Sequence, residues 1–277
     1  MRLNPRYGVS LLCWYFNCST SGYYDWVKRG CPIHNKLDTA KAFAISQVHR
    51  HRPARGRRQV MMQLERQYGI HMCLGSVHRY MSALGLSSSR KRKFVVPKKE
   101  TQNLCAFPNV LRQDFRSSLC ASVKWVTDIT YLPCTDGMLY LSCIKDLSDK
   151  SIIAYELSGK NDLLLVMNTL KKAAPQILAN TILHSDQGSQ YQSPLYHAFL
   201  KQHGVIGSMS RKATPYDNAP MESFFSILKN EELKPLRNIT CSHMRPVIDR
   251  FIHFYNHLRP QMALQKLTPV EYRSQFL

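Results

Sequence analysis

The chain has 277 residues, of which 44% are hydrophobic, enough for one large domain or for a domain with a smaller attachment. It contains no run of about 18 apolar residues, as a transmembrane helix requires. The N-terminus lacks the small-residue cleavage site of a signal peptide, so we expect no membrane association. The nine cysteines are scattered and odd in number. This pattern favours free thiols in a reducing compartment over a disulfide framework.

The formal net charge of +20 is concentrated in the first third of the chain. Residues 1–100 carry 19 Lys+Arg and 4 Asp+Glu, a balance of +15, whereas residues 101–277 carry 19 and 14, a balance of +5. Such an uneven distribution indicates a segment that binds a polyanion, and nucleic acid is the most common one. The alternative is a merely soluble basic protein. The clusters "HRHRPARGRR" and "SRKRK" favour nucleic acid.

Short helices joined by tight turns are predicted at the N-terminus. The stretch 8–29 reads as helix, turn and helix, with Thr20 or Ser21 capping the second helix. The apolar face of the first helix consists of Leu11, Leu12, Tyr15 and Phe16. We interpret residues 1–35 as a helix-turn-helix-like segment.

Two further helices are predicted over 56–69 and 73–86, where glycines end the apolar pattern. Short helices with basic flanks suit a helix-turn-helix that binds DNA, although an ordinary helical bundle is the alternative. We therefore interpret residues 36–86 as a second helical DNA-binding segment. Its expected DNA contacts are Arg57, Arg58 and Arg79.

Residues 87–108 lack a helical period and combine a serine run, a basic cluster and two prolines, which is typical of a linker. The cluster consists of Arg90, Lys91, Arg92 and Lys93. We expect these side chains to lie along a DNA backbone, and a nuclear localisation signal is the alternative.

The hydrophobic period changes after the linker, and residues 109–277 are predicted to form a catalytic core with C-terminal helices. Three alternating stretches, 122–133, 137–148 and 150–158, predict an antiparallel meander. The pattern then predicts, in chain order, a helix at 162–178, a strand at 180–186, a helix at 193–204, a strand at 205–210, and helices at 218–233 and 242–258. This order predicts an α/β fold with a mixed sheet covered on both faces.

Three carboxylates occupy positions that such a sheet could bring to one edge. Asp128 lies inside the first predicted strand, Asp186 ends the fourth, and Glu222 lies early in a helix. Carboxylates held together repel one another unless a cation is present. Hard ions such as Mg²⁺ or Mn²⁺ take oxygen ligands, and a pair of them can promote displacement at phosphorus. By spacing alone this triplet is only suggestive.

Around these acids the sequence resembles a known family. The motifs "WVTDITY", "LHSDQGSQY" and "SMSRKATPYDNAPMESFFSILKNE" resemble the acidic triad of integrase-core transposases, and 35 residues separate Asp186 from Glu222. Lys229 matches the basic residue of the same helix, and "YNHLRPQMALQKLTPVEY" resembles the closing motif. Upstream, "LCWYFNCSTSGYYDW" and "GRRQVMMQL" resemble the preceding helix-turn-helix segments. The chain is thus similar to the orfB-type transposases of the insertion-sequence-three family over nearly its whole length.

The resemblance implies a ribonuclease-H-like core that cleaves insertion-sequence ends and transfers the 3′-hydroxyl to another phosphodiester. It implies that Asp128, Asp186 and Glu222 are catalytic and bind two Mg²⁺ (or Mn²⁺) ions. Lys229 would contact phosphate near the cleavage site, and Arg211 and Lys212 would hold the terminal nucleotides. The expected partners are double-stranded DNA, both the terminal inverted repeats and the target, and further copies of the chain. An upstream orfA product or a frameshift fusion is a further candidate, and the expected location is the bacterial cytoplasm.

Several alternatives remain open from the sequence. His184 is either a residue that orients a metal ligand or a packed strand residue. The core is either a transposase, a nuclease of the same fold that does not join strands, or a catalytically dead DNA-binding regulator. The complete triad favours an active enzyme.

Overall fold

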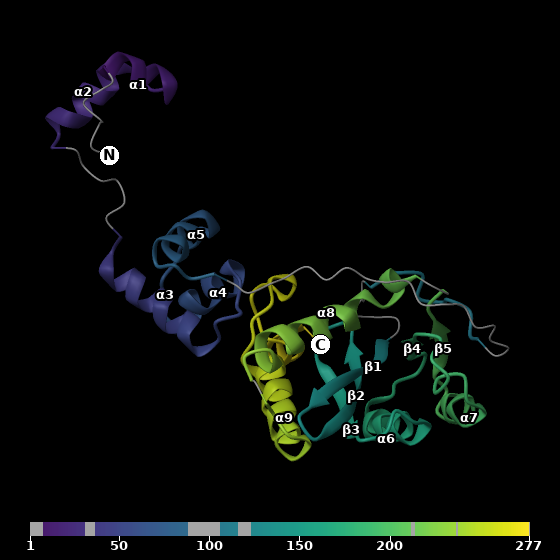
Figure 1. Cartoon of the computed structure of the whole chain (residues 1–277). Coiled ribbons are helices and arrows are strands. Elements are labelled where there is room, and N and C mark those ends of the chain that lie inside the picture. Colours follow the sequence, from purple (N-terminus) through teal and green to yellow (C-terminus); the bar gives the residue numbers. More distant parts are fainter. Residues whose placement is uncertain are drawn as a thin grey trace. The chain divides into compact units, whose positions relative to one another are not determined.

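A computed structural model of the chain describes residues 8–30, 37–87, 106–115, 123–211, 214–236 and 238–276. It divides into two compact units, Met1–Phe43 and Ala44–Leu277, whose helices and strands are labelled in Figure 1. The predicted DNA contacts Arg90, Lys91, Arg92, Lys93 and Lys212 lie outside the described residues.

The first unit contains the predicted helix-turn-helix, with α1 at Val9–Tyr15 and α2 at Thr20–Lys28. Ser19 caps α2, rather than Thr20 or Ser21, because its hydroxyl accepts a hydrogen bond from the Gly22 amide at 3.1 Å. The apolar side chains of α1 are largely exposed, at 54% for Leu11, 73% for Tyr15 and 52% for Phe16. The two helices were therefore predicted correctly, but these apolar side chains are not buried by the described part of the chain.

Three helices follow: α3 at Thr39–His51, α4 at Arg57–Tyr68 and α5 at Leu74–Ala83. The predictions for α4 and α5 are confirmed, and Gly69 ends α4 in the left-handed conformation with φ of 62°. Helix α3 was not predicted. Its start is marked by Asp38, whose carboxylate accepts hydrogen bonds from the Ala40 and Lys41 amides.

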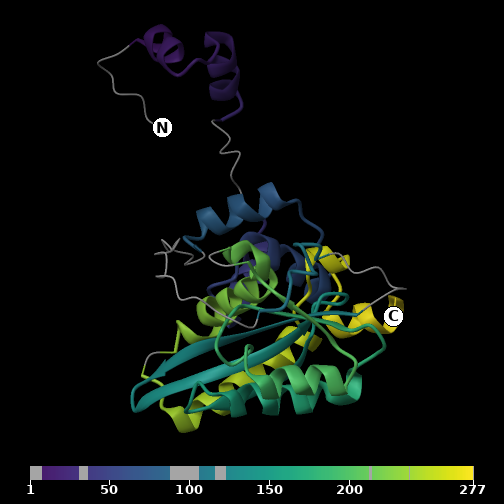
Figure 2. The ribbon, with the colours of Figure 1, turned by 90° about the vertical axis from the view of Figure 1, so that its right-hand side faces the viewer.

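The core is built on a mixed five-stranded sheet of order β3-β2-β1-β4-β5. Its strands are β1 at Lys124–Cys134, β2 at Gly137–Asp146, β3 at Ile152–Ser158, β4 at Ile182–Ser185 and β5 at Ile206–Met209. The first three form the predicted antiparallel meander, while β4 runs parallel to β1 and to β5. The long β1–β2 hairpin extends beyond the short strands β4 and β5 (Figure 2).

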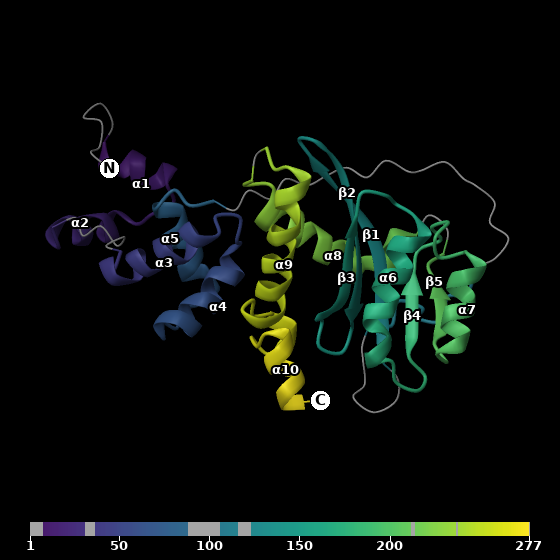
Figure 3. The same cartoon turned by 90° about the horizontal axis from the view of Figure 1, so that it is seen from below.

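Helices cover both faces of the sheet, as predicted, because successive strand residues point to opposite sides. On one face, Trp125 and Leu183 pack with α6 (Leu163–Ala173) and α7 (Pro194–Gln202). On the other, Val126 and Leu141 pack with α8 (Ala219–Ile227) and α9 (Cys241–His257) (Figure 3). The chain also forms 3₁₀ turns at Ala174–Gln176, Pro215–Asn218 and Met262–Leu264, a π-helical segment at Leu228–Leu233 that continues α8, and α10 at Pro269–Phe276. Among the described helices, none has the length and apolar character needed to cross a membrane.

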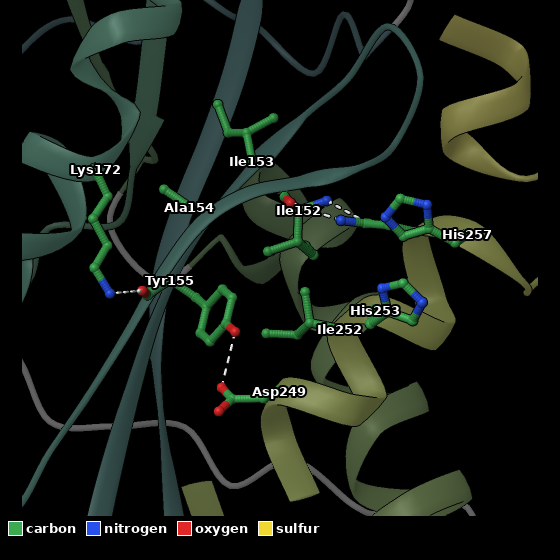
Figure 4. A pocket seen from close by; sticks show the side chains of 10 residues that line it. Ile152, Ile153, Ala154, Tyr155, Lys172, Asp249, Ile252, His253 and His257 are labelled. Atoms are coloured by element: carbon green, nitrogen blue, oxygen red, sulfur yellow. Dashed lines mark hydrogen bonds between the residues drawn. The ribbon is translucent and has the colours of Figure 1, made fainter. Parts of the chain in front are cut away.

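The outer edge of β3 is occupied by side chains from α6 and α9 (Figure 4). The Tyr155 hydroxyl donates to Asp249 at 2.8 Å, and Lys172 donates to the Tyr155 carbonyl at 3.1 Å. Asn256 exchanges two hydrogen bonds with the backbone of Ile152, at 3.0 and 2.9 Å. These groups line a hollow of about 330 Å³. Side chains thus satisfy backbone groups of an edge strand that could otherwise pair with another chain.

Helix α4 is bonded to the segment that follows α9. The side chains of Gln59 and Gln63 donate to the carbonyls of Pro260 and Leu258, at 2.9 and 3.3 Å. Ion pairs of 2.6 Å join Arg66 to Glu271 and Glu65 to Lys266. Helix α4 is therefore held against residues 258–271, which we call the closing segment, within the second unit.

Candidate acidic site

Asp128 lies in the middle of β1, opposite Cys143 of β2, on the face covered by α8 and α9. Its carboxylate accepts a hydrogen bond from the Ile129 amide at 2.7 Å. Burial raises the pKa of Asp128 to about 7, and the negative charges of Asp186 and Glu222 add to this effect. The three predicted acids are therefore close enough to interact electrostatically.

Asp186 follows β4 directly. Because Val126 pairs with His184 in the parallel register, Asp186 lies two residues beyond that pair, as Asp128 does on β1. Its Oδ1 accepts the Gly188 amide at 2.9 Å, so Asp186 also shapes the turn. Gln187 anchors the same turn by donating to the Ser210 carbonyl at 3.1 Å. The strand register and the turn together place this carboxylate beside β1.

Gly188 leaves room for that carboxylate. A Cβ atom at this position would lie 3.0 Å from Asp186 Oδ1 and 3.2 Å from Gln190 Oε1. Both distances are shorter than ordinary van der Waals contact. A larger residue at position 188 would therefore push on the acid itself.

Glu222 lies in the first turn of α8. The helix is fixed by the buried side chains of Met221, Phe224, Phe225 and Leu228. At its start, Asn218 donates from its side chain to the Thr127 carbonyl at 3.2 Å, next to Asp128. Burial raises the pKa of Glu222. The packing of α8 thus brings the third acid to β1.

Asp217, which the sequence analysis did not single out, holds the loop before α8. Its buried carboxylate accepts the Arg211 amide at 2.8 Å and two guanidinium nitrogens of Arg211, both at 3.1 Å. It also accepts the side chains of Asn109 and Gln113, at 2.9 and 2.7 Å. The hydrogen bonds from Arg211 hold the pKa of Asp217 well below its usual range. The residues of "PYDN" favour a turn, but they give no signal for the hydrogen-bond partners of Asp217.

Lys229 lies at the start of the π-helical segment, where its ammonium group is 4.3 Å from the centre of the Tyr131 ring. The positive charge of Lys229 lowers the pKa of Asp128. Lys229 therefore lies close enough to Asp128 to interact with it electrostatically. The next turn is fixed by a buried ion pair of 2.8 Å between Glu231 and Arg259. Arg259 belongs to the closing motif and was another residue that sequence reasoning missed.

His184 is buried between β4 and β5. Its Nδ1 lies 2.8 Å from the Ser208 hydroxyl and its Nε2 lies 3.0 Å from the Ser210 hydroxyl. Burial lowers the pKa of His184 to about 4, so the ring is neutral at physiological pH. These contacts fit the alternative of a packed strand residue.

The remaining predicted DNA contacts are distributed over several elements. Arg57 and Arg58 are exposed at the start of α4, and Arg79 is exposed on α5. Arg211 lies between β5 and α8, where its side chain pairs with Asp217 but stays 63% exposed. The four arginines therefore belong to three separate parts of the chain, α4, α5 and the loop before α8.

The donor set at the acidic site fits a hard divalent cation. Two of its carboxylates have a raised pKa, which shows that the site disfavours its own negative charge. Oxygen ligands of this kind suit Mg²⁺ or Mn²⁺. Asp128, Asp186 and Glu222 are therefore the residues that could hold such an ion.

Comparison with known proteins places this site in a family. Residues 120–215 and 203–269 match two models described as integrase core domain, and residues 36–94 match an HTH-like domain. Transposase InsF for insertion sequence IS3A of Escherichia coli K12 is 30% identical over 278 residues, covering 98% of this chain and 96% of the relative. The chain belongs to the insertion-sequence-three family of transposases. The HTH-like match overlaps the second predicted helical segment, 36–86, and the integrase-core matches lie within the predicted core, 109–277.

Two other relatives of this transposase family are similar over most of the chain. Putative transposase InsK for element IS150 of Escherichia coli K12 is 37% identical over 236 residues, covering 83% of this chain and 82% of the relative. An uncharacterized 31 kDa protein of insertion element IS600 from Shigella sonnei is 35% identical over 275 residues, covering 96% of this chain and 98% of the relative. The integrase core and the transposase relatives support membership in a polynucleotidyl transferase family.

The solved structures similar to this chain include viral integrases. The HTLV-2 integrase catalytic core domain in complex with magnesium has a TM-score of 0.44 at 15% identity, covering 54% of this chain and 94% of the other. A simian T-cell lymphotropic virus intasome in complex with a PP2A regulatory subunit has a TM-score of 0.49 at 14% identity, covering 82% and 73%. The mixed five-stranded sheet and the integrase-core match confirm the predicted fold class.

Proposed function

We propose that the protein cleaves DNA at the ends of an insertion sequence and joins the freed 3′-hydroxyl to another phosphodiester. The observation that carries this proposal is the placement of the three acids: Asp128 and Asp186 lie two residues beyond a paired position of β1 and β4, and Glu222 lies in the first turn of α8, which Asn218 ties to β1. Membership in a transposase family supports the choice of DNA as substrate.

Asp128, Asp186 and Glu222 would hold two Mg²⁺ or Mn²⁺ ions. When bound, such a pair activates the attacking oxygen and stabilises the leaving oxygen at phosphorus. The protein's own contribution is placement, because Asn218 ties the start of α8 to β1 and Asp217 fixes the loop before it. Lys229, beside Asp128, supplies a positive charge for a DNA phosphate close to the reacting bond.

DNA binding extends beyond the acidic site in this proposal. The terminal inverted repeats are contacted by the segments 1–35 and 36–86 and by the linker 87–108. The DNA backbone is bound by Arg57, Arg58, Arg79 and the cluster Arg90 to Lys93. Arg211 and Lys212 hold the terminal nucleotides. Two DNA ends must be held together for joining, which favours a homo-oligomer in the bacterial cytoplasm. The protein acts alone or with an upstream orfA product or fusion.

A strand-joining assay tests this proposal. The full-length protein is incubated with Mg²⁺ and a duplex that carries the ends of the element in which the gene lies. We expect 3′-end cleavage followed by a joined product. Asp186→Asn should abolish both while leaving the affinity for DNA largely unchanged, because the substitution removes a charge but keeps the shape of the turn.

The same assay separates the alternatives. Nicks without joined product from the wild-type protein would indicate a nuclease of the same fold. DNA binding without either product would indicate a dead regulator. Joining that persists in the Asp186→Asn variant would contradict the assignment of the site.

A further inference from the structure

A second hollow lies on the face of the sheet that carries Asp128, beside the first turn of α8. Its volume is about 320 Å³, and its polar lining residues include Lys145, Lys150, Ser223, Tyr255 and Gln261. Lys145 comes from β2 and Lys150 from the turn after it, while Tyr255 belongs to α9. This hollow is separate from the one beside β3.

Lys145 is a buried cation, because its residue is only 5% exposed. Its ammonium group donates to the Pro220 carbonyl at 3.3 Å. It also lies 6.0 Å from the ring centre of Phe224 and 5.7 Å from that of Tyr255. A carbonyl and two ring faces offset part of the cost of burying the charge, but none of them carries a full negative charge.

The two carboxylates nearest in sequence to Lys145 and Lys150 already have other partners. Asp149 is fully buried and accepts the guanidinium of Arg273 and the Ser151 amide. Asp146 accepts Ser148 and also lies 3.7 Å from Arg273. Among the residues that the structure describes, no carboxylate forms an ion pair with Lys145 or Lys150. The two lysines at this hollow therefore have no carboxylate ion-pair partner among the described residues, although the charge of Asp149 is close enough to act on Lys150.

The other polar groups point to the same kind of ligand. The side-chain nitrogen of Gln261 is buried and has no hydrogen-bond partner within the described part of the chain. Ser223 and Tyr255, which also line the hollow, each carry a hydroxyl that can donate a hydrogen bond. Burial lowers the pKa of Lys150, and the charge of Lys145 adds to this effect, while Asp149 acts in the opposite direction. A compact anion with several acceptor oxygens satisfies all of these groups.

We propose that this hollow binds a phosphate group through Lys145, Lys150 and Gln261. The group is either a backbone phosphate of DNA or free phosphate, and its position favours DNA. Ser223 follows Glu222 directly, and Lys145 pairs with Val126, two residues before Asp128. A strand that reaches the acidic site thus passes next to the hollow. Only the DNA form of this inference rests on the proposed function.

The salt dependence of DNA binding tests the DNA form. Each phosphate contact contributes about one unit to the slope of log affinity against log salt concentration. Lys150→Gln in the full-length protein should reduce this slope by about one. Lys171→Gln, which removes an exposed lysine of α6, should leave the slope unchanged. Lys150 is preferred to the more deeply buried Lys145, whose replacement could disturb folding.

The binding of free phosphate is tested by thermal unfolding. The Tm is measured in inorganic phosphate and in chloride at equal ionic strength and pH. A rise in Tm of the wild type that is lost in Lys150→Gln, with an unchanged DNA slope, identifies free phosphate as the ligand. An unchanged slope and an unchanged phosphate response in Lys150→Gln would overturn the site. Strand joining by the wild type is measured in parallel, so loss of the phosphate site and loss of the proposed function are told apart.

Discussion

At the residue scale, the pKa of Asp128 makes the stability of the fold depend on pH. Its pKa is raised from 3.8 to about 7, first by burial and then by Asp186. An unfolded carboxyl loses its proton near 3.8, whereas the folded one keeps it to about 7. The metal-free fold therefore loses stability as pH rises across this window.

The same raised pKa predicts the pH dependence of metal binding. A metal ion must displace the proton of Asp128, so affinity rises with pH. With a pKa of about 7, the ionised fraction grows roughly tenfold between pH 6 and pH 8, and the apparent Mg²⁺ affinity should grow by a similar factor. Calorimetric titration at both pH values measures this. An affinity that does not change with pH would contradict the electrostatic account of Asp128.

For Asp217 we predict the opposite dependence of stability on pH, because hydrogen bonds from Arg211 lower its pKa. Its contribution to stability is present above the unfolded value of 3.8 and is lost as pH falls below it. Asp217→Asn removes the charge from a buried acceptor and should lower the free energy of unfolding at pH 7 by about 1.5–3 kcal/mol. Urea unfolding at pH 7 and pH 3 measures the effect, which should shrink at the lower pH. Asp25→Asn, at an exposed position of α2, is the control.

At the scale of structural elements, the turn between β4 and α7 leaves little space beside Asp186. Gly188→Ala would place a methyl group 3.0 Å from Asp186 Oδ1. We expect strand cleavage to fall at least about tenfold, since small displacements of catalytic groups are costly, while the fold persists. Gly159→Ala is the matched control, because its Cβ would meet no atom within 4 Å. Equal cleavage by both variants would show that the turn tolerates the shift.

The order of the core elements could be predicted because each has a clear hydrophobic period. Strand β1 alternates and α9 has a broad apolar face, so both were predicted from their own residues. Helix α3 has a weak apolar period, and α10 is short, so neither gave a usable signal. The π-helical segment after α8 depends on packing that no local pattern encodes.

The candidate site was predictable only in part for a similar reason. The three acids lie in recognisable motifs. Besides Arg211, which is six residues away, Asp217 is bonded to Asn109 and Gln113, which are 108 and 104 residues away in the sequence. Such partners are set by the fold, so no local reading of "PYDN" could have named them. The same holds for Arg259, whose partner Glu231 is 28 residues away.

At the scale of the whole molecule, the concentration of charge in residues 1–100 predicts that DNA binding depends steeply on salt. Arg57→Gln combined with Arg58→Gln should reduce the slope of log affinity against log salt by about two, if each arginine contacts one phosphate. Fluorescence anisotropy with a labelled duplex measures the slope. A flat salt response of the wild-type protein would contradict an electrostatic role for this region.

The bonds between α4 and the closing segment restrict how such genes can exchange parts. Gln59 and Gln63 bind carbonyls of Leu258 and Pro260, and Arg66 pairs with Glu271, although about 200 residues separate the partners. A chimera that takes its helix-turn-helix from a relative but keeps its own C-terminus would mismatch these contacts. Recombination between elements should therefore preserve function best when both ends of the reading frame are inherited together.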